Sequence, residues 1–162
     1  MGKHPEYYAF IDSQNLNLSV RNQGWTLDFK RFYWYLRNKC NATKVFLFIG
    51  YIPGNQSLYT HLQKFGYIVV FKPTLGLPDG GTKGNVDADL VLHTMLEKDN
   101  FDKAIIVSGD GDFYCLLEYL NNHNKLHKLI IPNQEQFSSL FRPFGKYILF
   151  VSDLKDKLEY RK

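Results

Sequence analysis

The chain has 162 residues, of which 44% are hydrophobic and 16% aromatic, a length that allows one sizeable core and is too short for two ordinary domains. Charged residues make up 22%, and the lack of long polar or low-complexity tracts excludes a largely disordered chain. No stretch approaches the ~20 apolar residues of a membrane-spanning helix, and the first residues lack the apolar run of a signal peptide. We therefore expect one cytoplasmic domain over residues 1–162, with a core at about 7–152 and a C-terminal tail at 153–162, and no membrane partner.

Cysteine content and net charge give weaker guidance. Cys40 and Cys115 lack the clustered spacing of a zinc site or a disulfide framework, so we expect two reduced, buried thiols. The formal charge of +4 and the isoelectric point near 8.9 mildly favour a polyanionic partner.

The first half of the chain alternates between predicted strands and helices. Residues 7–12 (YYAFID) predict a strand that is hydrophobic on both faces. Residues 45–52 and 67–73 predict the second and third strands. The helix before the second strand is predicted by a stripe at i, i+3, i+4, i+7 and i+11, namely Phe29, Phe32, Tyr33, Leu36 and Cys40. The helix after it is predicted by Leu58, Leu62 and Phe65.

The segment 73–85 is the one long irregular stretch, with four glycines and two prolines. Irregular loops of ~12 or more residues in a compact domain are usually functional or disordered. Two interpretations stay open, a mobile flap and a plain surface connection.

The second half continues the alternation of helix and strand. Residues 104–109, 128–132 and 147–152 predict three further strands. Two helices are predicted by the stripes Val86, Leu90, Val91 and Met95, and Phe113, Leu116, Leu117 and Leu120. This order predicts the α/β class, a single-domain three-layer sandwich with a central, mainly parallel sheet and right-handed crossovers.

Four aspartates are predicted at the end of this sheet where sites form. Asp12 ends the first strand, Asp110 and Asp112 follow the fourth strand, and Asp87 opens the preceding helix. Because sites in open parallel sheets lie outside the carboxyl ends of the strands, we expect these acids to converge. Asp is also a common turn residue and helix cap, so capping by Asp110 or Asp112 is the competing interpretation.

Converging carboxylates need a neutralising partner. Two carboxylates ~4 Å apart repel by roughly 1 kcal/mol in water and about 4 kcal/mol at an effective dielectric constant of 20. Oxygen-rich sites suit Mg²⁺ or Mn²⁺, and no comparable collection of His and Cys favours zinc. Gly109 and Gly111 would allow a tight turn that lets both following aspartates face the crevice. Asn15 is placed to hold the Asp12 carboxylate or a metal-bound water.

Three motifs resemble those of NYN domains, the LabA-like branch of the PIN-like nuclease superfamily. They are FIDSQNL (10–16), KGNVDADLVL (83–92) and IIVSGDGDF (105–113), in the family's order and spacing, and the resemblance covers roughly residues 7–152. It implies PIN-like, Rossmannoid topology and metal-dependent ribonuclease activity. Two departures are His93, where many members carry a further aspartate, and Asn85, which stands between Gly84 and Val86.

The resemblance and the acid pattern together define a candidate site. The expected metal ligands are Asp12, Asp87, Asp110 and Asp112, with Asn15 as a further catalytic residue. The expected reaction is hydrolysis of RNA phosphodiester bonds with one or two Mg²⁺ or Mn²⁺ ions. Asp89 and His93, one helical turn apart, are candidate modulators of the site. The alternative from another class is a non-catalytic NYN-type module that binds RNA or regulates.

Substrate contacts are expected from positive charge and aromatic rings, because unpaired bases stack on aromatic side chains. The candidates are Lys83, Ser108, Arg31 and Trp34, and the RNA is expected to be single-stranded. Trp34 has two competing roles, in the core at a helix edge or in the contact of a homodimer. Dinucleotide binding and serine-elbow hydrolysis are excluded because the chain lacks the corresponding glycine and serine motifs.

Overall fold

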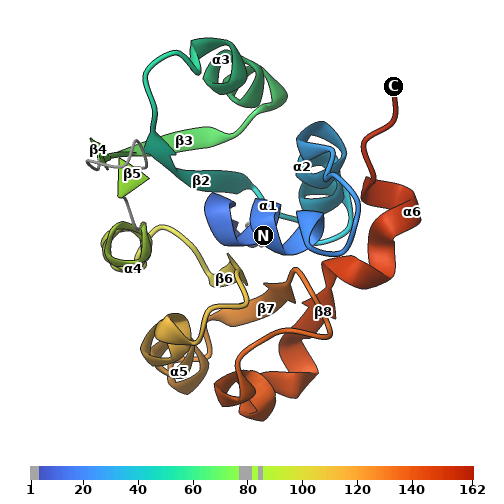
Figure 1. The fold of residues 1–162 in the computed structure, drawn as a ribbon. Coiled ribbons are helices and arrows are strands. Elements are labelled where there is room, and N and C mark those ends of the chain that lie inside the picture. The colour runs from blue at the N-terminus through green and yellow to red at the C-terminus, as the bar shows by residue number, and fades with distance from the viewer. Residues whose placement is uncertain (1–3, 77–81, 84–85) are drawn as a thin grey trace.

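A six-stranded parallel sheet forms the centre of the computed structural model, which describes residues 4–76, 82–83 and 86–162, without the side chains of 75–76 and 82–83 (Figure 1). The strand order is β3-β2-β1-β6-β7-β8. The bounds are β1 Tyr7–Asp12, β2 Lys44–Tyr51, β3 Ile68–Pro73, β6 Lys103–Val107, β7 Leu126–Ile131 and β8 Ile148–Phe150. All neighbouring pairs in this sheet run parallel, which confirms the predicted α/β class.

Helices cover both faces of the sheet. They are α1 Ser13–Arg21, α2 Phe29–Asn38, α3 Gln56–Phe65, α4 Asp87–Leu96, α5 Tyr114–Asn122 and α6 Lys155–Leu158, with 3₁₀ segments η1 Gly111–Phe113, η2 Ser139–Tyr147 and η3 Val151–Leu154. Figure 1 shows α1, α2 and α6 on one side of the sheet and α4 and α5 on the other. The three-layer sandwich predicted from the sequence is therefore present.

The alternation of side chains along each strand divides the core in two. Ala9 and Ile11 of β1 belong to the cluster under α1, α2 and α6, whereas Tyr8 and Phe10 belong to the cluster under α4 and α5. Successive strand residues point to opposite faces, so a central strand must be apolar at every position to fill both clusters. This is the physical reason for the unbroken apolar run of β1.

The apolar pattern did not predict η2, and it did not predict helix α1. Its apolar residues Leu16, Leu18 and Val20 alternate with polar residues, a pattern typical of a strand. Only Leu16 and Val20 of these are buried, together with Ser13, and their spacing of three and four residues is helical. The exposed Leu18 is the residue that obscures the helical pattern.

The expectations for the segment 73–85, the two cysteines and the C-terminal tail have different outcomes. The segment 73–85 contains an antiparallel pair of two-residue strands, β4 Leu75–Gly76 and β5 Thr82–Lys83, whereas the flap expected over 77–81 and 84–85 lies outside the described residues. The prediction of two buried thiols holds for Cys40 and is wrong for Cys115, which lies off the apolar stripe of α5 and is exposed. The expected tail contains α6, which buries Leu158 in the core.

None of the helices in the described ranges has the length and apolar character needed to cross a lipid bilayer.

Candidate functional site

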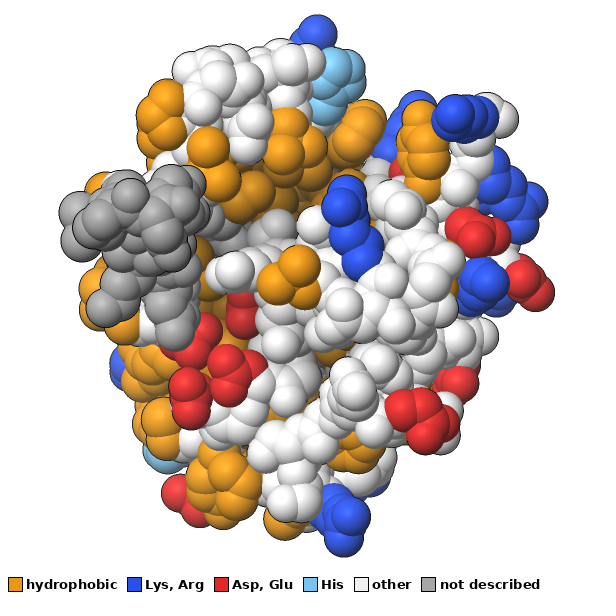
Figure 2. All heavy atoms as spheres, in the orientation of Figure 1, with side chains coloured by type: hydrophobic (Ala, Val, Ile, Leu, Met, Phe, Trp, Pro, Cys, Tyr) orange, Lys and Arg blue, Asp and Glu red, His pale blue; other side chains and the backbone are white. Residues whose placement is uncertain are grey.

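Three aspartates from separate segments meet at the carboxyl end of the central strands. Asp12 ends β1, Asp110 follows β6, and Asp87 is the first residue of α4. One carboxylate oxygen from each lies within 4.8 Å of the other two. β1 and β6 are hydrogen-bonded neighbours, so residues that follow them emerge side by side. Figure 2 shows a group of acidic side chains on this face, between α4, β6 and α5. We call Asp12, Asp87 and Asp110 the acid triad.

The acid triad lines a pocket of about 300 Å³. Gln14, Asn15, Leu18 and Val86 complete the lining among the described residues. Asn15 was expected in the site, whereas Gln14 and Leu18 were not. Both come from α1, and because the helix itself was not predicted, no spacing argument could place them beside the acids. Had α1 been recognised, the i, i+4 relation of Gln14 and Leu18 would have put them on one face.

Asp12 is the most enclosed member of the acid triad, with 4% of its surface exposed. Its Oδ1 accepts a hydrogen bond from the Asn15 backbone N–H at 3.2 Å, and its Oδ2 accepts one from the Ser108 hydroxyl at 3.3 Å. Burial raises the pKa of the Asp12 carboxyl, with a further upward contribution from Asp110, and this outweighs the two hydrogen bonds. Ionisation is therefore less favourable than for a free aspartate, and a bound cation would favour the ionised form.

Two hydrogen bonds fix the segment after β6 relative to α1. The Ser108 hydroxyl accepts from the Asp110 N–H at 3.1 Å while it donates to Asp12. The Asn15 Oδ1 accepts from the Gly109 N–H at 2.9 Å. Ser108 was expected to contact substrate, but its side chain is completely buried. The structure instead gives Ser108 contacts that position the Asp12 carboxylate and the backbone of Asp110.

Asp110 is both a cap and a member of the acid triad. Its Oδ1 accepts from the Asp112 N–H at 2.9 Å and so caps η1. The capping interpretation is therefore correct for Asp110, and it does not exclude a role at the pocket. Asp112 is exposed and stands outside the group of acids whose oxygens come together in the described part of the chain. The structure thus brings together three of the four expected carboxylates.

Gly111 is required for packing. A Cβ at this position would lie 2.5 Å from the Ser138 Oγ and 2.9 Å from the Ser138 Cβ. At Gly109 the nearest atoms would be 3.7 Å away, an ordinary contact. Gly111 therefore allows η2 to approach the turn closely, a reason different from the expected freedom to orient two aspartates.

The remaining candidates on α4, Asp89 and His93, do not belong to the acid triad. Asp89 forms an ion pair with Lys72 of β3, with 3.4 Å between Oδ2 and Nζ. The His93 ring packs edge-on against Phe48 at a centroid distance of 5.4 Å. Phe48 of β2 pairs in register with Asp12 of β1. His93 therefore contacts a residue that neighbours Asp12 in the sheet. The side chain of Lys83 lies outside the described residues.

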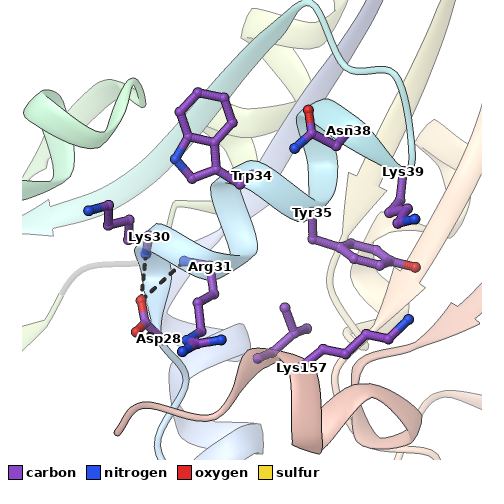
Figure 3. Close-up of a pocket in the computed structure, with 9 residues that line it drawn as sticks. Asp28, Lys30, Arg31, Trp34, Tyr35, Asn38, Lys39 and Lys157 are labelled. Carbon is purple, nitrogen blue, oxygen red and sulfur yellow. Dashed lines mark hydrogen bonds and ion pairs between the residues drawn. The ribbon is translucent and has the colours of Figure 1, made fainter. Parts of the chain in front are cut away.

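Arg31 and Trp34 belong to a separate cavity of about 550 Å³ on α2 and α6, the α2 groove (Figure 3). Figure 3 shows their side chains arranged around this groove with those of Tyr35 and Lys157. The described lining is Asp28, Lys30, Arg31, Trp34, Tyr35, Asn38, Lys39, Lys157 and Leu158, and none of these residues also lines the acid pocket. Trp34 is 50% exposed, which excludes the expected alternative of a core position.

Comparisons with known proteins agree with this geometry. The family model described as the NYN domain matches residues 8–149. A crystal structure of a protein of unknown function from Vibrio parahaemolyticus RIMD 2210633 shares the fold, with a TM-score of 0.78 and 24% identity over 98% of this chain and 99% of that one. A search of curated proteins found no significant match. The family match includes all three members of the acid triad, and the chain therefore belongs to the NYN domain family of the PIN-like superfamily.

Proposed function

We propose that this protein hydrolyses phosphodiester bonds in RNA, with Mg²⁺ or Mn²⁺ held by Asp12, Asp87 and Asp110. The observation that carries the proposal is the meeting of three carboxylates, each within 4.8 Å of the others, in one pocket of about 300 Å³. Membership of the NYN domain family supports a nuclease-type activity on nucleic acid.

The residues present fit a hard dication. All three charged donors are carboxylate oxygens, the ligands that Mg²⁺ and Mn²⁺ prefer. The raised pKa of Asp12 shows that burial and a neighbouring acid oppose its ionisation, which is the electrostatic problem a dication removes. A bound dication would lower the pKa of a coordinated water and offset charge that develops on the phosphate.

The protein's own contribution is to hold the carboxylates in place before substrate arrives. Asp12 is held by the Ser108 hydroxyl and the Asn15 N–H, and Asp110 by the Asp112 N–H. These bonds immobilise ligand groups in the free protein, so less ordering is required on binding. The Asn15 Oδ1 is occupied by Gly109, and its Nδ2 has no partner in the described part of the chain. In our proposal the Nδ2 group donates to a phosphate oxygen in the pocket.

The proposal is tested by incubating the protein with a fluorescence-quenched RNA, with Mn²⁺ and then with excess EDTA. Metal-dependent fluorescence gain that EDTA abolishes is the expected result. RNA that binds with Mn²⁺ present but is never cut would favour the non-catalytic NYN-type module instead.

We also propose that the α2 groove holds RNA outside the acid pocket. Four cationic side chains and one carboxylate line the groove. Asp28 pairs with Arg31 at 3.6 Å, and no carboxylate of the described residues forms an ion pair with Lys30, Lys39 or Lys157. This leaves net positive charge beside an exposed indole, the combination typical of surfaces that bind single strands.

Trp34→Ala is expected to weaken RNA binding by about tenfold, within the range for the loss of one base stacked on an aromatic ring. Affinity is measured by fluorescence anisotropy with a labelled unstructured RNA in EDTA, so that no cleavage occurs. Trp34→Phe should retain most of the affinity because it retains a stacking face. Lys157→Gln should reduce the slope of log affinity against log salt by ~0.7.

Lys64→Gln is the matched control, because Lys64 is an exposed lysine on α3 outside the groove, and it should leave the affinity unchanged. Equal affinity for the native protein and Trp34→Ala would refute an RNA contact in the α2 groove. If Trp34→Ala instead turned a dimer into a monomer in light scattering, the groove would be a contact between two copies.

A further inference from the structure

We infer that a second pocket beside the acid triad binds one unpaired nucleobase of the RNA strand. This base pocket has a volume of about 240 Å³, and its described lining is Ser13, Gln14, Asn17, Ile49, Gly50, Ile52 and Thr74. Gln14 lines both this pocket and the acid pocket, so the two cavities are adjacent. The inference rests on the proposed function, because it places a base next to the phosphate that the acid triad would serve.

The α1 wall of the base pocket carries polar groups that are open to a ligand. Ser13 is 5% exposed, and its hydroxyl is not among the buried atoms without a partner in the described residues, so it reaches the pocket. Gln14 is exposed and Asn17 is half-buried, and their side-chain amides form no hydrogen bond within the ranges that the structure describes. A ligand in the pocket can therefore exchange hydrogen bonds with these three groups in place of water.

The part of the lining at the end of β2 is mainly apolar and is held in place independently of any ligand. Ile49 and Ile52 come from the end of β2 and the residues after it. The Ile52 N–H donates to the buried Tyr59 hydroxyl at 2.9 Å, which attaches this segment to α3. The Thr74 hydroxyl donates to the Tyr51 carbonyl at 2.7 Å and attaches it to the segment after β3. This part of the lining is therefore formed before binding, as is usual for ligand sites.

Gly50 brings the two strand ends close together in this part of the lining. A Cβ on Gly50 would lie 2.8 Å from the Thr74 Cγ2, so any side chain there would displace Thr74. Both residues line the base pocket, and the close approach fixes its shape.

The lining indicates a base as the occupant. None of the described residues in the lining is charged, so these residues offer no ion pair to a phosphate. Its volume is below the ~300–1,000 Å³ of sites for drug-sized ligands, which suits one ring system. The isoleucines supply an apolar surface for the base, and the amides of Gln14 and Asn17 lie one helical turn apart on the same face of α1.

The amides can pair with the hydrogen-bonding edge of a base. A carboxamide presents a donor beside an acceptor, and adenine presents an amino donor beside a ring nitrogen acceptor, which is the pairing that Asn and Gln make with adenine. An unpaired uracil presents its ring N–H beside a carbonyl oxygen, so a carboxamide can pair with it as well. We therefore assign the base pocket to one unpaired base of either kind, at a position next to the bond that is cut.

The test is a titration of the native protein with adenosine 5′-monophosphate and with ribose 5-phosphate, which lacks the base, in EDTA, followed by NMR. Adenosine monophosphate is expected to shift the side-chain amide signals of Asn17 and Gln14, and to bind about tenfold more tightly than ribose 5-phosphate. Asn17→Leu keeps the size of the side chain, removes its amide, and should abolish most of this preference. Asn122→Leu makes the same change at an exposed position of α5 and should leave the preference intact.

Unmoved Asn17 and Gln14 signals, equal affinity for adenosine monophosphate and ribose 5-phosphate, or an unchanged preference in Asn17→Leu would each overturn the inference. None of these measurements requires cleavage. Mn²⁺-dependent cleavage with no nucleotide binding in the base pocket would refute the pocket and leave the hydrolysis proposal standing. Selective adenosine monophosphate binding by a protein that cuts no RNA would refute the hydrolysis proposal and leave the base pocket standing.

Discussion

Asp110→Asn is expected to reduce Mn²⁺-dependent RNA cleavage by at least about 100-fold, since even outer-shell changes at metal sites cost ~10–100-fold. The substitution removes one of three converging negative charges. It retains an amide oxygen that can accept the Asp112 N–H, and Asn caps helices about as well as Asp, so η1 should keep its cap. Initial cleavage rates measure the effect, and thermal unfolding followed by circular dichroism checks that the fold is intact.

Asp112→Asn is the matched comparison for that loss. It makes the same change two residues further along the same turn, at an exposed carboxylate outside the acid triad. We expect its cleavage rate to stay within about tenfold of the native rate, below the ~10–100-fold range for groups that support a metal site. Full activity in Asp110→Asn would refute the proposed mechanism. Equal large losses in both variants would show that the active group of acids is larger than the acid triad.

Mn²⁺ is expected to raise the melting temperature of the protein. A ligand that binds only the folded state at about 100 times its Kd stabilises that state by ~2.7 kcal/mol. For a chain of this length ~1 kcal/mol corresponds to about 2–4 °C, so the expected rise is roughly 5–10 °C. Differential scanning fluorimetry over a Mn²⁺ series measures it. Asp12→Asn should remove most of the rise, and an unchanged melting temperature at saturating Mn²⁺ in the native protein would contradict a metal site.

The pH dependence of this stabilisation follows from Asp12. Burial raises the pKa of Asp12 in the folded state above the ordinary value of 3.8, so the folded state holds this proton more tightly than the unfolded state. Without metal, the stability that Asp12 contributes is fully present at pH values below the ordinary pKa of aspartate. This contribution is lost as pH rises through the raised pKa of the folded state. The rise in melting temperature caused by Mn²⁺ should become larger as pH increases through the same range, because the metal must displace that proton. Asp12→Asn should remove both trends.

Much of the acid triad follows from local sequence patterns. The apolar runs before Asp12 and Asp110 are strands β1 and β6, and each aspartate stands at or just beyond a carboxyl end. In a parallel sheet those ends share one edge. The two aspartates therefore meet provided that β1 and β6 are neighbouring strands. Asp87 could be placed because it begins the helix leading into β6, and that helix starts at the same edge.

Other parts of the site depend on packing between distant segments. Asp112 follows Asp110 by two residues and yet is exposed and stands outside the acid triad, on the 3₁₀ turn that Asp110 caps. Ser108 was recognised as a site residue from the sequence. Its complete burial and its hydrogen bond to Asp12 depend on how the layers of the fold pack around it. Arg31 and Trp34 were assigned to substrate binding, and only the arrangement of α2 against α6 shows that they line a groove of their own.

By itself the sequence determined the α/β class, the six strands of the sheet, the family resemblance and four candidate carboxylates, of which three meet in the structure. Strand and helix patterns depend on which side chains along a short segment must avoid water, and that information is local. Only the tertiary structure decided that α1 is a helix, that its Gln14 stands between the acid pocket and the base pocket, and that Gly111 admits η2. Those features are distances between side chains on different elements, and they are set by how the layers pack against one another, which no single stretch of the chain encodes.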